Sequence, residues 1–366
     1  MAKYKLGEIC EIVSGSTPKT GIAEYWDGNL KWITPAEIDD ESHIITDSAR
    51  KLTELGVKKT GLSSFPSGTV ILSSRAPIGK VAIAGCEMYC NQGFKNLICS
   101  DRINNRYLYW FLKGNTAYLN SLGRGATFKE ISKKIVSDIE INVPGISQQL
   151  AAVDALERVS EIIRLRKNQL QKLDELIKAR FVELFGDPEL NPRGLPVLPW
   201  NAVFLTTTGK LDSNAMVENG RYPFFTCAKE SYKINSYAFD CEALLLAGNN
   251  AAGIYDVKHY KGKFNAYQRT YVLRLMNEKW SYILFKRQLE DKLQYLQSQS
   301  KGTNTRYLTL GILNELRFVV PPVAEQEQFA VFVEQTDKSK LAIQQSLDKL
   351  KTLRKSLMQE YYGQGE

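Results

Sequence analysis

The stretch of sequence that decides the fold occurs twice in this chain. It reads GRGATFKEISKKIVSDIEINVPGISQQL from Gly123 to Leu150, and SKGTNTRYLTLGILNELRFVVPPVAEQEQF from Ser300 to Phe329. Both copies are polar, glycine-containing loops that lead into a short amphipathic stretch, a Val-Pro pair and a Gln-rich helix start. The chain therefore carries the same local signals at two distant places.

The two copies keep one register. Gly125 lies 177 positions before Gly302, and this offset holds without a gap up to Gly186 and Gly363. Identical residues that coincide at this offset include Val143 and Val320, Pro144 and Pro321, Gln149 and Gln326, Leu170 and Leu347, Leu173 and Leu350, and Leu176 and Leu353. A register kept for so long indicates a duplicated module, and two copies are too few for a solenoid.

Each copy is predicted to contain one long helix. The first begins after Pro144 and ends at Gly186, where Asp187-Pro188 follows as a stop signal. The second runs from about Pro322 to Gly363. Each helix has roughly 38 residues, which corresponds to about 57 Å at a rise of 1.5 Å per residue.

Apolar residues recur along both helices in steps of three and four, a spacing typical of helices that pack against each other. Packing of each helix on its own globular domain is the alternative. Pairing is favoured, because a long helix with one apolar stripe needs a partner. A local two-fold axis would make the pair an antiparallel coiled coil, whereas parallel pairing would put the flanking domains side by side. The predicted seam contains Leu156, Val159, Ile163, Leu170, Leu173, Ile177, Ile343, Leu347, Leu350 and Leu357.

The remaining segments are predicted to be two globular domains. Runs such as TVILSSRAPIGKVAIAG, CEALLLAG and RTYVLRL are typical of strands bounded by Gly and Pro, and each segment also contains a short helix candidate. The two segments are otherwise dissimilar in sequence. The expected fold class is mixed α/β (α+β) with a pseudo-two-fold repeat: domain 1–143, helix 144–186, domain 187–320 and helix 321–363.

Positive charge is concentrated in the globular segments. The net charge is +3 over residues 1–145 and +5 over residues 187–320, but only +1 over 146–186 and zero over 321–363. Two basic domains joined by neutral helices suit a polyanionic partner that binds the domains.

Familiar catalytic signatures are absent from the sequence. It contains no GxxxxGK[ST], GxSxG, HExxH or GxGxxG motif and only two histidines. The six cysteines include no CxxC pair, so reduced thiols of a cytosolic protein are expected, and a zinc site at Cys86 and Cys90 is the minor alternative. No apolar run is long enough for a membrane span. A binding role is favoured over catalysis.

This layout resembles the specificity subunit of type I restriction-modification enzymes over essentially the whole chain. YKLGEICEIVSGSTPKTGIAEYWDGNLKWITPAEI, ILSSRAPIGKVAIAG and NQGFKNLI are similar to a target-recognition domain of that family. The stretch from YPFFTCAKESYKINSYAFD to AYQRTYVL looks like another branch of the same domain type. VPGISQQL and VPPVAEQEQF match the family's Pro-Pro-x-x-Glu-Gln helix entry, with Gly145 and Gln148 departing in the first copy.

The resemblance implies that each domain reads one half of a bipartite, asymmetric site in double-stranded DNA, and that the helix pair sets the spacer. It implies a cytoplasmic protein without an active site or cofactor of its own. Expected partners are methyltransferase subunits, two in number, which methylate adenine with S-adenosylmethionine, and a translocating endonuclease subunit. No membrane partner is expected.

Candidate DNA contacts are polar side chains on predicted loops, because such side chains read base edges and phosphates. In the first domain they are Ser16, Thr17, Lys19, Thr20, Arg75, Gln92, Lys95, Arg124, Thr127 and Lys129. In the second domain they are Asn249, Asn250, Gln268, Arg269, Lys301, Asn304 and Arg306. The alternative is that many of them cap turns, and that Arg75 and Arg269 form salt bridges within the fold.

Two other functions stay open at this point. The basic domains are also compatible with a catalytic nucleic-acid enzyme, which would cut or methylate DNA by itself. The heptads alone are compatible with a coiled-coil adaptor that makes no DNA contact.

Overall fold

The computed structural model describes residues 2–39, 42–125 and 129–363, and it divides into two compact units. Unit 1 comprises Met1–Lys167 and Gln345–Glu366, and unit 2 comprises Asn168–Gln344. The boundaries at Lys167 and Gln344 are 177 positions apart, so they fall at equivalent places in the repeat. Each unit therefore holds one mixed domain, the first half of the long helix after it, and the second half of the other long helix.

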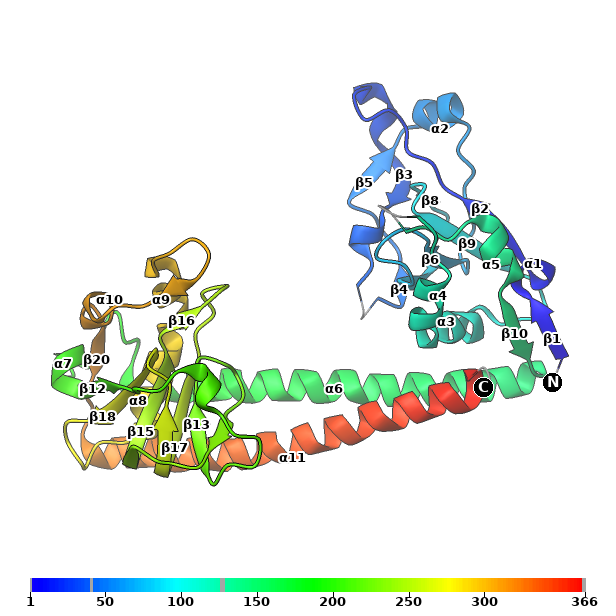
Figure 1. Ribbon diagram of the computed structural model, residues 1–366. Helices are drawn as coiled ribbons and strands as arrows, with labels where there is room; N and C mark the ends of the chain where they lie inside the picture. Colours follow the sequence, from blue (N-terminus) through cyan, green and yellow to red (C-terminus); the bar gives the residue numbers. More distant parts are fainter. Residues whose placement is uncertain (1, 40–41, 126–128, 364–366) are drawn as a thin grey trace. The chain divides into compact units, whose positions relative to one another are not determined.

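Unit 1 consists of three sheets and several helices (Figure 1). Its main sheet has the strand order β2-β9-β6-β7-β4, a smaller sheet has the order β5-β3-β8, and β1 pairs with β10. The strands are β1 (Ala2–Lys5), β2 (Cys10–Ser14), β3 (Trp26–Ile33), β4 (Ile44–Ile45), β5 (Arg50–Leu52), β6 (Val70–Ser73), β7 (Val81–Ala84), β8 (Tyr89–Cys90), β9 (Phe94–Cys99) and β10 (Glu140–Val143). The short helices are α1 (Leu6–Ile9), α2 (Glu54–Thr60), α3 (Asn105–Gly114), α4 (Thr116–Ser121) and α5 (Lys133–Asp138).

Unit 2 is built around one six-stranded sheet with the order β12-β18-β15-β17-β13-β14. The strands are β11 (Val197–Pro199), β12 (Phe204–Thr208), β13 (Tyr222–Phe225), β14 (Tyr232–Ile234), β15 (Phe239–Ala247), β16 (Asn249–Asn250), β17 (Val257–Ala266), β18 (Thr270–Leu275), β19 (Arg306–Tyr307) and β20 (Arg317–Val319). The short helices are α7 (Trp200–Val203), α8 (Tyr282–Asp291), α9 (Leu293–Gln299) and α10 (Leu310–Asn314).

The two domains share one topology although their sequences differ. The strand order β2-β9-β6-β7 of unit 1 corresponds to β12-β18-β15-β17 of unit 2. The terminal pair β1-β10 corresponds to β11-β20, and α3, α4 and α5 occupy the places of α8, α9 and α10. The duplication therefore extends beyond the helical module to the whole domain, which confirms the expected mixed α/β class.

The two long helices have the predicted lengths. Helix α6 spans Ile146–Phe185 and helix α11 spans Val323–Tyr362, with 40 residues each. Both begin at equivalent positions of the repeat, so Gly145 in place of the second proline does not shift the start of α6. None of the helices in the described part of the chain is long and apolar enough to cross a bilayer.

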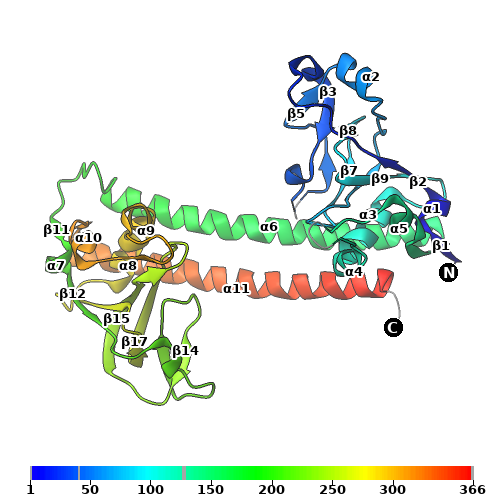
Figure 2. The ribbon, with the colours of Figure 1, turned by 45° about the horizontal axis from the view of Figure 1, so that its top comes forward.

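In unit 1 the start of α6 packs against the end of α11. Leu156 and Tyr362 are buried in one cluster with α3, and Leu357 and Met358 pack against it. Six consecutive residues of α3, Tyr107–Leu112, are buried, because the sheet covers one side of the helix and the long helices cover the other (Figure 2). Of the predicted seam in this unit, Leu156, Val159, Ile163 and Leu347 are buried, and Leu350 and Leu357 are half-buried.

In unit 2 the end of α6 packs against the start of α11. Phe185 contacts Phe329 with ring centroids 5.6 Å apart, and Asp174 pairs with Lys340 at 2.6 Å. Residue numbers rise along α6 while those of the partner residues fall along α11, so the helices run antiparallel in this unit as they do in unit 1. Ile177 and Ile343 of the predicted seam are buried, and Leu170 and Leu173 are half-buried.

A buried glutamine joins each long helix to its own domain. The side chain of Gln149 accepts a hydrogen bond from the Asn104 backbone N–H at 2.8 Å and donates one to the Pro144 carbonyl at 2.8 Å. Gln326 accepts from the Ser281 N–H at 3.0 Å and donates to the Pro321 carbonyl at 2.8 Å. Asn104 and Ser281 are the N-caps of α3 and α8. The spacing that both helix entries share thus has a physical cause, since the glutamine orients the short helix relative to the long one.

Candidate nucleic-acid interface

Four loops of unit 1 meet at one end of the main sheet. The Ser16 N–H donates to the Cys90 carbonyl at 3.0 Å, the Ser74 N–H to Gly93 at 2.7 Å, and the Ile131 N–H to Ser74 at 2.9 Å. We call residues 15–20, 74–79, 91–95, 124–125 and 129–131 the unit 1 loop surface. The structure therefore brings together segments that lie far apart in the sequence.

Most of the predicted contacts of the first domain are exposed on this surface. Thr17 donates a hydrogen bond to the side chain of Gln92, which fixes the first loop to the loop before β9. The Trp26 indole N–H donates to the Lys19 carbonyl at 3.3 Å. Thr127 lies outside the described residues. Exposed candidates are Ser16, Thr17, Lys19, Thr20, Arg75, Gln92, Arg124 and Lys129.

Lys95 requires a correction. Its sequence position predicts a loop residue that contacts DNA, but Lys95 lies in β9 and is only 6% exposed. Strand β9 lies between β2 and β6 in the main sheet, and its first four residues, Phe94–Leu97, are buried. The Lys95 ammonium donates to Glu130 and to the Ser74 hydroxyl, both at 3.3 Å. Its placement supports an internal role and not direct contact with DNA.

Glu130 links Lys95 to Arg75. Its Oε1 atom accepts from Lys95, and its Oε2 atom accepts from the Arg75 Nε at 2.9 Å. Burial alone would raise the pKa of the Glu130 carboxyl, but the hydrogen bonds from Arg75 and Lys95 outweigh it and lower the pKa. The three side chains thus form one charged network with Glu130 ionised at its centre.

The corresponding loops of unit 2 meet in the same way. The Gly248 N–H donates to the Arg269 carbonyl and the Leu308 N–H donates to Gly248, both at 2.8 Å. Strand β16 pairs with β19, which places Asn249 opposite Tyr307 and Asn250 opposite Arg306. We call residues 209–211, 248–254, 267–271 and 301–308 the unit 2 loop surface.

The predicted contacts of the second domain also gather there. Gln268, Arg269, Lys301, Asn304 and Arg306 are exposed, whereas Asn249 and Asn250 are half-buried. Asn250 accepts from the Ala252 N–H at 2.8 Å with its side-chain oxygen, and Arg306 donates to the Gln297 carbonyl at 3.3 Å. Turn capping, the alternative left open by the sequence, therefore occurs at Asn250. Contact of these residues with DNA stays a prediction.

The loop surfaces are equivalent position by position. The bridge between Arg124 and Glu130 in unit 1 corresponds to that between Lys301 and Tyr307 in unit 2. The hydrogen bonds at Ser74 and Gly248 correspond in the same way. Counting along the paired strands then places Arg75 with Asn249, Lys95 with Tyr271, and Gln92 with Gln268. One backbone frame therefore presents different side chains at the first two of these positions and the same glutamine at the third.

Sequence reasoning missed two residues of these surfaces. Glu130 is one of them, and its sequence context gives no signal, because a carboxylate is a poor phosphate ligand. Lys210 is exposed at the place that Ser16 occupies in unit 1. The signal for Lys210 was the preceding glycine: a Cβ on Gly15 would collide with the Cys90 carbonyl, and one on Gly209 with the equivalent Ala266 carbonyl. This shared requirement aligns the two loops where the side chains give no match.

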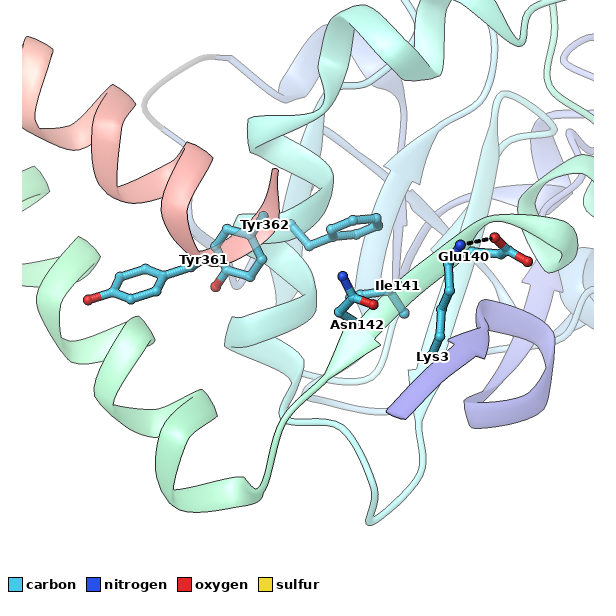
Figure 3. A pocket seen from close by; sticks show the side chains of 7 residues that line it. Lys3, Glu140, Ile141, Asn142, Tyr361 and Tyr362 are labelled. Carbon is cyan, nitrogen blue, oxygen red and sulfur yellow. Dashed lines mark ion pairs between the residues drawn. The ribbon is translucent and has the colours of Figure 1, made fainter. Parts of the chain in front are cut away.

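Other features of the described residues do not form a comparable site. No group of three His, Cys, Asp or Glu among them is placed to hold a metal ion, and Cys86 and Cys90 are free thiols. A hollow of about 190 Å³ in unit 1 is lined by Lys3, Glu140 and Tyr362 among others (Figure 3). Lys3 and Glu140 pair with each other at 2.5 Å, so they offer no free charge to a ligand.

Known proteins with the same features fall into one family. The family described as type I restriction modification DNA specificity domain matches residues 1–175 and 203–352. The specificity subunit of the type I restriction enzyme MjaIX from Methanocaldococcus jannaschii is 30% identical over 397 residues, covering 97% of this chain and 90% of that protein. The EcoDI specificity subunit from Escherichia coli is 36% identical over 173 residues, covering 45% of this chain and 38% of that protein.

Solved structures agree with this fold. The S subunit of a type I restriction-modification system from M. genitalium superimposes with a TM-score of 0.65 at 15% identity, covering 100% of this chain and 96% of that one. A chain from a study of assembly and conformational transition of the type I R-M system gives a TM-score of 0.58 at 18% identity, covering 99% and 97%. Because the family match spans most of the sequence and the MjaIX relative aligns over nearly its whole length, this chain belongs to the DNA specificity subunits of type I restriction-modification systems.

Proposed function

We propose that the chain reads a bipartite, asymmetric site in double-stranded DNA, with one loop surface on each half. The observation that supports this is the shared frame with different side chains. Equivalent backbones offer equivalent approaches to DNA, while Arg75 in one unit and Asn249 in the other offer different hydrogen-bond donors and acceptors to base edges. Two copies of one reader with unlike side chains give unlike half-sites.

The excess of positive charge supports the same function. It lies in the domains, at +3 and +5, and the exposed cations on the loop surfaces include Lys129, Arg124, Lys210, Arg269 and Lys301. Contacts to phosphates supply affinity and orient the protein, whereas contacts to base edges supply specificity. We expect these cations to hold the backbone of the duplex while neighbouring polar groups read the bases.

The long helices would set the separation between the half-sites. A helix of 40 residues is about 60 Å long, and antiparallel pairing stiffens it within each unit. DNA completes a turn in about 10 base pairs, so both the distance and the rotational phase between two readers have to be fixed. A flexible linker would leave both undetermined.

We propose that the chain itself is not catalytic and works in an assembly. Its partners would be methyltransferase subunits, two in number, that bind S-adenosylmethionine and methylate adenine, and an endonuclease subunit that translocates DNA. A similar chain comes from a study of complex assembly of the type I R-M system, which supports assembly of this chain as well. We place the complex in the cytoplasm.

The decisive experiment is to determine the methylation motif of cells that carry this subunit with its partners. We expect two specific half-sites separated by a spacer of fixed length. Exchange of residues 1–143 for the first domain of another family member should change one half only. A motif without a spacer, or a change in both halves, would contradict independent reading by the two units.

A catalytic enzyme and a DNA-independent adaptor predict other results. The purified chain alone should neither cut nor methylate DNA when Mg²⁺ or S-adenosylmethionine is added. Its affinity for DNA should fall steeply with salt, because each phosphate contact releases counterions. Activity of the isolated chain would support the first alternative, and absence of DNA binding by the complex would support the second.

A further inference from the structure

The guanidinium of Arg75 is held by one edge only. Its Nε atom donates to Glu130 at 2.9 Å. Its two terminal nitrogens have no hydrogen-bond partner within the described residues. The side chain is 46% exposed. Arg75 therefore presents its terminal N–H groups to solvent from a fixed position on the unit 1 loop surface.

Glu130 is itself held in place. Its other carboxylate oxygen accepts from Lys95, whose side chain is 8% exposed and also reaches the Ser74 hydroxyl. A buried ammonium without a counter-charge is unfavourable, so Lys95 keeps Glu130 ionised and fixes its rotamer. The order of support runs from the interior outward: Lys95 holds Glu130, and Glu130 holds Arg75.

Unit 2 shows that the fold does not need this network. At the three equivalent positions it has Tyr271, Tyr307 and Asn249, and no charge among them. The same backbone bridges form there, and the Tyr271 hydroxyl donates to the Leu308 carbonyl at 3.0 Å. A charged network around a buried lysine that its structural duplicate lacks is better explained by function than by folding.

We propose that Arg75 reads a guanine in the half-site of unit 1 and that Glu130, supported by Lys95, is its positioning residue. Guanine is the base that presents two acceptors, N7 and O6, in the major groove, and arginine is the side chain that most commonly bonds to both. The exposed terminal nitrogens of Arg75 match that pair. This inference rests on the proposed function, since it assigns one base to one of the two half-sites.

The experiment uses the full chain assembled with its methyltransferase partners and a library of DNA duplexes randomised in both half-sites. Bound duplexes are sequenced for the wild type and for Arg75→Ala, at two salt concentrations. We expect one G·C position in the half-site of residues 1–143 to lose its preference by roughly 5- to 150-fold, with the other half unchanged. Asn249→Ala is the matched control, and its effect should be confined to the opposite half.

Glu130 is tested by a readout that a purely structural residue would not affect. Glu130→Gln should weaken the preference for G·C at the same position, but less than Arg75→Ala does. Glu130→Asp should retain more of this preference than Glu130→Gln. Thermal unfolding identifies the variants that fold. Arg75→Lys keeps the positive charge but not the paired N–H donors, so this variant should lose the preference for the G·C pair while the salt dependence of DNA binding stays the same.

Three results would overturn the inference. Uniform weakening over all sequences with a shallower salt dependence would make Arg75 a phosphate contact. Relaxation at an A·T position would refute guanine, and a base preference unchanged by Glu130→Gln would refute the positioning role. If the wild-type complex selects no two-part motif at all, the proposed function is wrong as well. If the wild-type complex selects such a motif and Arg75→Ala leaves it unchanged, only this inference is wrong.

Discussion

The two loop surfaces differ in how they hold their reading side chains. In unit 1 a charged network runs from buried Lys95 through Glu130 to Arg75, whereas unit 2 places Asn249 and Tyr307 on the same backbone bridges. The comparison separates what the frame requires from what specificity requires. Backbone hydrogen bonds and the glycines Gly15 and Gly209 recur, whereas most side chains that face the solvent differ, with Gln92 and Gln268 as the exception.

The junction between domain and long helix shows the opposite behaviour, since it is the same in both units. Gln149 and Gln326 are both fully buried, and each accepts a hydrogen bond from the N-cap of the short helix in its own unit, α3 or α8, through the same atoms. A part that must orient two elements tolerates little variation, because a buried polar group needs all its partners. Variation is thus concentrated at the loops, and identity at the junction.

The largest expected effect comes from breaking this shared junction. Gln149→Ala leaves the Asn104 N–H and two carbonyls without their partner and opens a cavity, so we expect a loss of about 3 kcal/mol of stability in unit 1. Gln326→Ala removes two bonds and should cost about 2 kcal/mol in unit 2. Urea unfolding measures the loss, and hydrogen exchange of the α3 and α8 amides locates it.

The exposed neighbour Gln148 provides the control. Gln148→Ala should change stability by less than about 0.5 kcal/mol, as is usual for exposed substitutions. Equal losses for Gln148→Ala and Gln149→Ala would show that the helix start, and not the buried side chain, determines stability at this junction.

The second effect concerns the helix seam of unit 2. Leu173→Asp places a carboxylate at a half-buried seam position and should destabilise the unit by about 2 kcal/mol. Leu176→Asp introduces the same charge three residues later, where the side chain is 48% exposed, and should cost far less. Thermal unfolding of both variants measures the difference. Equal melting temperatures would show that Leu173 does not belong to the seam.

The sequence predicted the features that repeat. The offset of 177 located both long helices, the heptads indicated their seam, a local two-fold axis between the copies predicted the antiparallel direction, and the resemblance implied the domain type. The sequence did not predict that Lys95 is buried and paired with Glu130. A lysine between Phe94 and Asn96 does not indicate that β9 lies inside the sheet, next to a carboxylate from a distant loop. Contacts between residues 35 positions apart are not encoded in local spacing, so the network became visible only in the structure.

A third, smaller effect concerns the last residue of each long helix, which differs between α6 and α11. Tyr362 in unit 1 stands where unit 2 has Phe185, and its hydroxyl is buried without a hydrogen-bond partner among the described residues. Burial raises the pKa of the Tyr362 phenol, as expected for a hydroxyl kept away from solvent. Tyr362→Phe should therefore stabilise unit 1 by about 1 kcal/mol. The converse change, Phe185→Tyr, should destabilise unit 2, and calorimetry of both variants compares the two ends. A destabilising Tyr362→Phe would mean that the hydroxyl has a partner such as water.

The smallest effect comes from an ion pair at the helix seam of unit 2. Lys340 of unit 2 pairs with Asp174 at 2.6 Å, while the position equivalent to Lys340 in unit 1 is Ile163, which is 3% exposed. Burial lowers the pKa of the Lys340 ammonium, but the hydrogen bond that Lys340 donates to Asp174 and the nearby carboxylate charges outweigh burial and leave the pKa raised. Because the side chain of Asp174 is 53% exposed, solvent screens the pair and Asp174→Asn should cost only about 0.5 kcal/mol, less at high salt.

Ile163→Val removes one buried methyl group and should cost about 1 kcal/mol at any salt concentration. Unfolding at low and high salt distinguishes the two, since a salt-independent loss for Asp174→Asn would mean that the carboxylate acts through packing and not through its charge.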